Sequence, residues 1–268
     1  MVKRWIFAAA ALALGPMTFL APMTALAQAQ PAPAHTFTGV YNISFRGLPA
    51  GEASYSINVS GSQYSATSSQ RATGIARAAV SSSQDYASSA RGVINAQGVR
   101  PATYQHQGGR RNRLVRVAFS STDAITTATP PFGSMGNPPA TPAQKAGSLD
   151  NLSAFVAMTM APGVADPCAR TIRVFDGRAR FDFVMTPNGR QSVNTRAFRG
   201  SAFRCRVEFR PVAGFTDPPA IDGPMSFVFA PLENGMFLPV RIEFPTDDGV
   251  AVLQIRTAST TGPRLPWR

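Results

Sequence analysis

Apolar residues recur at every second position through most of this chain, and this period constrains the fold more than any other feature. In residues 52–59 (EASYSINV) and again in 240–244 (VRIEF), apolar and polar side chains alternate. Successive side chains point to opposite faces of a β-strand, so the alternation predicts half-buried strands. A long antiparallel meander has to curl or close to protect its edges. The sequence therefore predicts a mainly β fold with one large, strongly curved antiparallel sheet, either a half-barrel or a closed β-spiral.

One short helix is expected near residues 149–161, after a Pro-rich break at 130–147. Ser148 or Asp150 can cap its start, its apolar residues fall on one side at helical spacing, and a Pro-Gly pair follows its end. Asn-Gly or Asp-Gly pairs at 176–177, 188–189, 234–235 and 248–249 predict tight turns. We expect a single β domain over residues 36–262.

The first 27 residues have the pattern of a cleaved signal peptide. Lys3 and Arg4 precede a short apolar stretch, and Ala25-Leu26-Ala27 is a cleavage pattern. A retained membrane anchor would need about 20 apolar residues, and prolines interrupt this stretch earlier. Residues 28–35 (QAQPAPAH) are expected to be a Pro/Ala linker. We predict cleavage after Ala27 and a bacterial periplasmic protein that does not span the membrane.

The positive charge predicts anionic partners. The chain has 26 Lys and Arg against 14 Asp and Glu, and removal of Lys3 and Arg4 leaves a net charge of +10. Such a surface attracts anions, which in a cell envelope are lipid headgroups, lipopolysaccharide phosphates or acidic proteins, and not nucleic acid. The first hypothesis is thus a non-enzymatic cell-envelope protein that binds a partner protein or an anionic envelope component.

Residues 168–184 (CARTIRVFDGRARFDFV) predict the best-defined hairpin. With Asp176-Gly177 as a two-residue loop, Arg173 lies opposite Arg180, an unfavourable pair of like charges. The phenylalanines lie on the core face, which argues against an RNA-reading sheet. Outward-facing arginines of this hairpin and of the strand around residue 205 form a candidate binding stripe: Arg173, Arg178, Arg180, Arg204 and Arg206.

The two cysteines, Cys168 and Cys205, both fall on the apolar side of their strands. One pair permits one intramolecular disulfide, which suits an oxidising compartment. By loop-closure entropy, this disulfide is expected to stabilise the fold by about 4 kcal/mol. A zinc site is not expected because two thiols lack the further ligands that zinc needs, and no other metal or cofactor site is predicted.

Catalysis is expected only as a remote alternative. His35 lies in the linker, and His106 is expected to be an exposed neighbour of a turn. Nucleophile-elbow, HExxH, P-loop and dinucleotide motifs are absent from the sequence. A hydrolase would need carboxylates brought together from distant positions.

A second alternative is a carrier of a lipid or another apolar molecule inside a curved sheet. It would use core-facing residues that otherwise serve packing: Tyr41, Tyr55, Phe181, Phe183, Phe209 and Ile242.

The order of several short motifs resembles the domain-of-unknown-function family 3108 of exported bacterial proteins. They are Tyr41-Asn42-Ile43-Ser44 followed by Gly47 to Gly51, Gly98-Val99-Arg100-Pro101, Asp150-x-x-Ser153-Ala154-Phe155, Val174-Phe175-Asp176-Gly177-Arg178, Cys205 with Ala213-Gly214, and Leu238-Pro239-Val240-Arg241-Ile242. The resemblance implies a periplasmic β protein and carries over no catalytic residues. In outline its architecture is similar to a lipoprotein-carrier half-barrel and to a disulfide-bearing β-spiral that docks partner proteins.

Overall fold

Thirteen antiparallel strands form one continuous sheet in the computed structural model, which describes residues 34–73, 85–109, 111–217 and 221–267. Along the sheet the strands run β7-β6-β5-β4-β3-β2-β1-β13-β12-β11-β10-β9-β8. The predicted mainly β fold with one large antiparallel sheet is therefore confirmed. The sheet is open, because β7 and β8 are its two edges. The predicted signal peptide and residues 28–33 of the predicted linker lie outside the described residues.

The strands are long and mostly joined to their neighbours in sequence. The first seven are β1 (Ala34–Phe45), β2 (Leu48–Ser60), β3 (Gln63–Ala72), β4 (Tyr86–Asn95), β5 (Gly98–Gly108), β6 (Arg113–Phe119) and β7 (Ala124–Thr129). The other six are β8 (Arg170–Phe175), β9 (Arg180–Asn194), β10 (Arg199–Ala213), β11 (Met225–Pro231), β12 (Phe237–Thr246) and β13 (Gly249–Thr261).

The sheet consists of two meanders joined at β1 and β13. Strands β1 to β7 follow one another, as do β8 to β13, and the junction pairs Thr36 with Thr261 at one end and Phe45 with Ala251 at the other. Buried and exposed residues alternate as the sequence predicts: Ala53, Ile57 and Val59 of β2 are buried, and the residues next to Ile57 and Val59 are exposed.

Strand β1 begins earlier than the sequence indicates. Ala34 pairs with Ser60 and His35 with Val59, so the last two residues of the expected linker belong to the sheet. His35 is buried, with 5% of its surface exposed. Pairing with β2 gives the backbone groups of these two residues hydrogen-bond partners. The small residues and prolines of this segment do not indicate that pairing.

Two helices lie between the meanders, where the sequence predicts one. Helix α2 (Pro142–Lys145) falls inside the Pro-rich break, and α3 (Asn151–Met160) corresponds to the predicted helix. Asp150 is the cap of α3: its carboxylate accepts hydrogen bonds from the amides of Leu152 at 2.9 Å and Ser153 at 2.8 Å. These bonds satisfy amides that have no partner within the helix.

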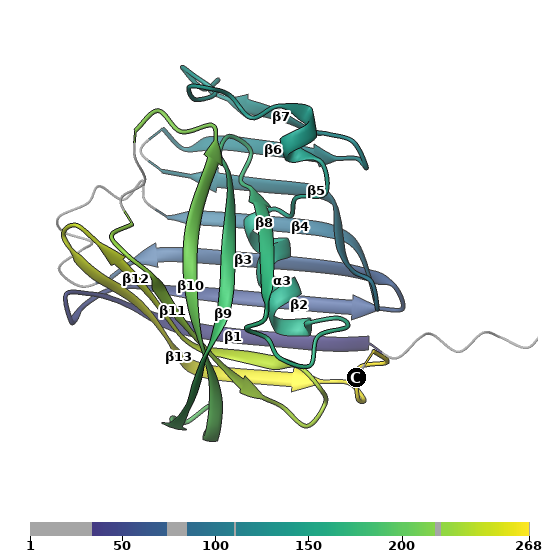
Figure 1. Ribbon diagram of the computed structural model, residues 1–268, viewed down its shortest axis with the longest axis vertical. Coiled ribbons are helices and arrows are strands. Elements are labelled where there is room, and N and C mark those ends of the chain that lie inside the picture. The colour runs from purple at the N-terminus through teal and green to yellow at the C-terminus, as the bar shows by residue number, and fades with distance from the viewer. Residues whose placement is uncertain (1–33, 74–84, 110, 218–220, 268) are drawn as a thin grey trace, which may run out of the picture. The chain divides into compact units, whose positions relative to one another are not determined.

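Helix α3 is packed between two parts of the sheet. It contacts β3, β4 and β5 on one side and β8 and β12 on the other. In Figure 1, β8, β9 and β10 cross in front of β2 to β5, and α3 lies behind β8. Nine of the ten residues of α3 are buried. Burial around its whole circumference is typical of a helix that is enclosed on all sides, and α3 is such a helix.

The predicted disulfide is present and lies in the core beside α3. Cys168 precedes β8, Cys205 lies in β10, and their Cα atoms are 5.1 Å apart. Both cysteines belong to one apolar cluster with Ile172, Val174 and Met158. The bond thus ties the segment after α3 to a strand two places along the sheet.

The pair Asn188-Gly189 forms a bulge, and the prediction of a turn there is wrong. Strand β9 continues through these residues, and the register with β10 shifts between Phe203 and Cys205. Two residues of β9, Asn188 and Gly189, lie opposite the single residue Arg204 of β10, and Gly189 has a φ of 78°. Glycine supplies the left-handed conformation that both a turn and a bulge use, so the pair alone does not distinguish them.

Removal of the disulfide should lower stability without changing the fold. The bond closes a loop with a sequence separation of 37. We expect the double variant Cys168→Ala/Cys205→Ala to lose about 4 kcal/mol of unfolding free energy. Urea unfolding followed by circular dichroism measures this loss. Equal unfolding free energies for the variant and the oxidised protein would contradict it.

The cap of α3 should make stability depend on pH. Burial raises the pKa of Asp150 to about 6, against about 3.9 in an unfolded chain. Between these values the folded state holds more protons than the unfolded state, so the free energy of unfolding falls as pH rises from about 4 to about 6.

The variant Asp150→Asn keeps a side chain that can cap and removes the titration. Its unfolding free energy, minus that of the wild type, should rise over the same pH interval in urea titrations. A difference that stays flat from pH 4 to pH 7 would show that Asp150 titrates normally.

Candidate binding surface

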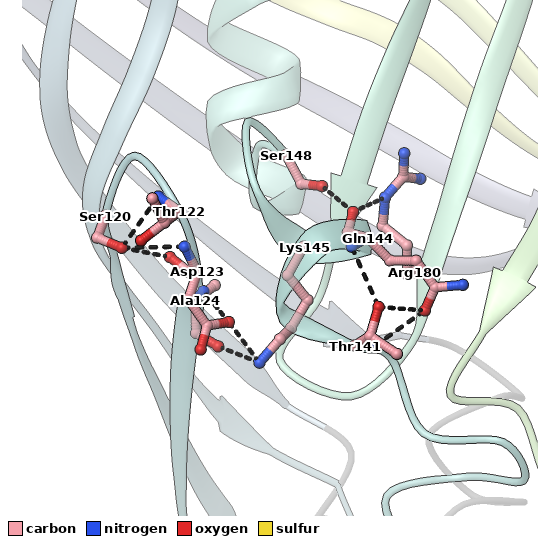
Figure 2. Close-up of polar contacts among 9 residues, drawn as sticks. All are labelled: Ser120, Thr122, Asp123, Ala124, Thr141, Gln144, Lys145, Ser148 and Arg180. Carbon is pink, nitrogen blue, oxygen red and sulfur yellow. Dashed lines mark hydrogen bonds and ion pairs between the residues drawn. The ribbon is translucent and has the colours of Figure 1, made fainter.

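The short helix α2 and its flanking residues link the two edges of the sheet. Figure 2 shows Lys145 reaching Asp123 and Ala124 at the start of β7, and Arg180 reaching the carbonyl of Gln144 from β9. Lys145 Nζ lies 2.7 Å from both Asp123 Oδ1 and the Ala124 carbonyl oxygen. The hydrogen bond from Lys145 lowers the pKa of Asp123.

Two arginines of the predicted stripe hold the end of α2. Nε of Arg180 donates to the Gln144 carbonyl at 3.0 Å, and Nη2 of Arg173 donates to the same oxygen at 3.1 Å. That carbonyl lies in the last turn of α2, where backbone oxygens have no partner within the helix. Arg173 and Arg180 are therefore structural side chains in this structure.

Arg180 is buried, contrary to its predicted place on a solvent-facing stripe. Its exposed fraction is 3%, and its Nη1 lies 2.6 Å from Asp182 Oδ1. Burial lowers the pKa of Arg180, and Asp182 opposes that shift. An ion pair with hydrogen bonds to carbonyls keeps this buried charge compensated.

The predicted pairing of Arg173 directly opposite Arg180 is wrong, because the hairpin has a longer turn. The two charges still repel each other: besides burial, Arg173 lowers the pKa of Arg180, and both side chains donate to the Gln144 carbonyl. Strand β8 ends at Phe175 and β9 begins at Arg180, with Asp176 Oδ1 accepting hydrogen bonds from the amides of Arg178 and Ala179. The register consequently places Arg173 opposite Asp182. A shift of two residues preserves which side chains share a face, so the core face of the hairpin is the one predicted.

The other predicted stripe residues lie apart from this cluster. Arg178 donates to Thr216 Oγ1 at 3.2 Å. Arg204 and Arg206 are exposed on β10, and Arg206 is 4.0 Å from Glu208. The five arginines thus do not form one stripe: Arg180 is buried and Arg178 half-buried, and exposed Arg173 is bonded to the end of α2, apart from exposed Arg204 and Arg206 on β10.

A second basic surface lies on β3 to β7, on the face that points away from α3. Two rows of side chains cross these strands in register. One row is Ser65, Arg91, Thr103, Ala118 and Ile125, and the other is Thr67, Ser89, Gln105, Arg116 and Thr127. They line a hollow of about 650 Å³, which we call the arginine hollow.

The arginine hollow is basic and lacks acidic side chains among the described residues that line it. Nε of Arg116 donates to Gln105 Oε1 at 3.2 Å, and Arg91 has no ion pair within the described part of the chain. Ile125 adds an apolar side chain that is 65% exposed. Two guanidinium groups among hydroxyl and amide groups are suited to bind a phosphate or carboxylate that is attached to a polar molecule.

No sequence motif distinguishes Arg91 and Arg116 from the other arginines. Each lies at an outward-facing position of its strand, but alternation places many other residues at such positions too, so it does not identify a site. What brings them into one hollow is the register across β4, β5 and β6, and this depends on the bulge between Arg91 and Gly92. Only the paired strands reveal it.

The residues predicted for a carrier lie in two separate clusters. Tyr41 and Tyr55 pack in the cluster that contains Phe155 of α3, and their rings are 5.6 Å apart. Phe181, Phe183, Phe209 and Ile242 pack in the cluster around the disulfide. Helix α3 contributes residues to both clusters, so these six side chains do not surround one common cavity.

The residues considered for catalysis have other surroundings than expected. His106 lies within β5 and is half-buried, so its predicted position as an exposed neighbour of a turn is wrong. Ser88 Oγ is 3.0 Å from its Nδ1. The buried carboxylates Asp150 and Asp176 cap a helix and a turn respectively.

Within residues 34–73, 85–109, 111–217 and 221–267, no three His, Cys, Asp or Glu side chains gather as a metal site would require. The same residues contain no helix of the length and hydropathy needed to cross a bilayer.

The fold defines this chain as a β protein in which one open sheet encloses a single buried helix. Residues 40–256 match the family described as "Protein of unknown function (DUF3108)", and the chain belongs to that family. The resemblance seen in the sequence motifs is thus confirmed, and it extends from β1 to β13.

Among solved structures, the chain is similar to a β-barrel-like protein of the domain of unknown function DUF1849 from Brucella abortus. The TM-score is 0.45 and the sequence identity 8%, over 86% of this chain and 98% of that chain. No curated protein matches the sequence.

Two arginines of the predicted stripe should differ sharply in their effect on stability. Arg180→Met leaves Asp182 without its ion-pair partner and removes one of the hydrogen bonds to the Gln144 carbonyl, and we expect a loss of about 3 kcal/mol of unfolding free energy. Arg204→Met changes an exposed side chain and should stay within about 0.5 kcal/mol of the wild type. Urea titrations of both variants measure the difference. Similar effects of the two substitutions would refute the structural role of Arg180.

Proposed function

We propose that the protein is a non-enzymatic periplasmic envelope protein that binds the phosphorylated headgroup of a glycolipid, lipopolysaccharide, in the arginine hollow. The observation that carries this proposal is that Arg91 and Arg116 line one hollow whose described lining has no carboxylate. Guanidinium groups form bidentate hydrogen bonds with phosphate, and an acid beside them would compete for these bonds.

The rest of the lining favours a sugar phosphate over a bare anion. Hydroxyl groups of Ser65, Ser89 and Thr103 and the amide of Gln105 can exchange hydrogen bonds with sugar hydroxyls. Exposed Ile125 and Ala118 offer apolar contact to the carbon face of a sugar or to the start of an acyl chain. A volume of about 650 Å³ is in the usual range for a small-molecule site.

Compartment and charge support the same proposal. The predicted signal peptide directs the chain out of the cytoplasm, and the disulfide is of a kind that persists in an oxidising compartment. The net charge of +10 after cleavage attracts the chain to an anionic surface before the hollow is occupied.

Titration of lipopolysaccharide into the purified, disulfide-bonded protein tests the proposal. The double variant Arg91→Gln/Arg116→Gln should weaken binding by about tenfold for each arginine, because each loses a charge-assisted hydrogen bond. Removal of the lipid phosphates by phosphatase should weaken wild-type binding to a similar extent. Isothermal calorimetry or surface plasmon resonance at low salt measures these affinities.

A matched control removes the same charge elsewhere. Arg204→Gln/Arg206→Gln lowers the net charge equally but leaves the hollow intact, so its affinity should stay within about twofold of the wild type. An equal loss in both double variants would mean nonspecific attraction to a basic protein. A loss only in the Arg204→Gln/Arg206→Gln variant would show that the binding site lies on β10 and not in the arginine hollow. Binding to an acidic partner protein without binding to lipopolysaccharide would show that the proposed ligand is wrong.

A further inference from the structure

The inner face of β3, β4 and β5 changes from apolar to polar along the strands. At one end it carries buried Tyr64, Ala66, Ala90 and Ile94. At the other end the same face carries Ser68, Gln70, Tyr86, Ser88 and His106, all half-buried. A face that served only to pack against α3 would remain apolar, because buried polar groups cost free energy unless they find partners.

The polar end of this face forms a pocket with a floor of small side chains. Tyr55, Ser68, Ser88 and His106 follow one another in register across β2, β3, β4 and β5. The two serines in the middle leave room between the rings of Tyr55 and His106. The pocket has a volume of about 210 Å³, and Asn151 and Leu152 at the start of α3 line another side of it.

Aromatic rings form the walls, and their positions are fixed by packing. The rings of Tyr86 and His106 are stacked, with centroids 5.2 Å apart and an interplanar angle of 16°. A side chain at Gly108 would collide with Tyr86, since a Cβ atom there would lie 2.6 Å from Cδ1 of the ring. The glycine therefore lets the ring of Tyr86 lie against the backbone of β5.

The hydrogen-bonding groups of the pocket are neutral. Ser88 Oγ is 3.0 Å from Nδ1 of His106, and Gln70 Nε2 donates to the hydroxyl of Tyr55 at 3.4 Å. Burial lowers the pKa of His106, which favours the uncharged imidazole. The described lining contains hydroxyl, amide and imidazole groups and no Asp, Glu, Lys or Arg.

The surroundings of the pocket disfavour a charged ligand. Besides burial, the nearby carboxylates Asp150 and Asp176 contribute to raising the pKa of Tyr104, so an anion here would meet the same unfavourable field. The same field attracts a cation, and Asp176 opposes the lowering of the His106 pKa by burial, but a cation would lose its hydration with no carboxylate in the lining to replace it.

We infer that this pocket binds one ring of a neutral sugar. Aromatic faces can lie against the apolar C–H face of a sugar ring, while the serine, amide and imidazole groups exchange hydrogen bonds with its hydroxyls. The volume leaves room for about seven waters, at about 30 Å³ each, which a single sugar ring can displace. This site lies on the opposite face of the sheet from the arginine hollow and does not depend on it.

Titration with sugars of matched structure and different charge tests the inference. The probes are neutral N-acetylglucosamine, cationic glucosamine and anionic glucuronate, added to the ¹⁵N-labelled, disulfide-bonded protein and followed by amide chemical shifts. N-acetylglucosamine should give saturable shifts in β3, β4, β5 and the start of α3. The two charged sugars should bind at least about tenfold more weakly.

Two variants on β4 separate the pocket from the rest of the strand. Ser88→Val fills the floor and should weaken N-acetylglucosamine binding by at least about tenfold. Ala87→Val introduces the same side chain on the opposite, exposed face of β4 and should leave binding unchanged. Tyr86→Leu removes a half-exposed ring and should weaken binding by about fivefold, with thermal unfolding to verify that each variant is folded.

Absence of saturable shifts with N-acetylglucosamine would overturn the inference, as would equal effects of Ser88→Val and Ala87→Val. Tighter binding of either charged sugar would also overturn it. Lipopolysaccharide binding by the Ser88→Val variant should equal that of the wild type, so failure of this inference is distinct from failure of the proposed function.

Discussion

The buried helix α3 is the element on which the rest of the structure depends. It packs between β3, β4 and β5 on one side and β8 and β12 on the other, and its residues belong to both apolar clusters. A helix enclosed in this way has to satisfy its own polar end, and Asp150 does so with hydrogen bonds to two backbone amides. The hydroxyl of Ser153 donates to Asp150 and also lies 2.6 Å from the hydroxyl oxygen of Tyr64 on β3. The helix is thus fixed to the sheet by polar contacts as well as by apolar packing.

The connection from β7 to β8 has a corresponding role at the edges of the sheet. Lys145 binds at the start of β7, while Arg173 and Arg180 bind the Gln144 carbonyl from β8 and β9. Side chains thereby hold the two edges through α2, although no strand pairing joins them. Arg180 is buried by this arrangement and Arg173 is bonded to the end of α2, whereas Arg91 and Arg116 of the candidate surface lie on other strands and are exposed.

Much of the fold could be predicted from the sequence, because alternation and capping are local signals. The period of two identified the strands, Asp150 was one of two predicted caps, and the parity of Cys168 and Cys205 placed both in the core. A register error of two residues does not change which face of the sheet a side chain is on. The predicted faces of the hairpin are therefore correct, although Arg173 lies opposite Asp182 and not opposite Arg180. The register itself depends on turns and bulges, such as the one at Asn188-Gly189, and these depend on the partner strand. The arginine hollow could not be predicted for the same reason, since Arg91 and Arg116 come to line one hollow only through the pairing of β4, β5 and β6.

The junction of β1 with β13 has a consequence for the order of folding. These two strands lie next to each other in the sheet, yet they are the first and last strands of the described residues, and Thr36 bonds to Thr261 across 225 positions. Neither meander has its neighbour at this junction until the C-terminal strand has been synthesised, and contacts between such distant residues form slowly. The sheet can therefore be completed only after the C-terminal strand β13 has been synthesised.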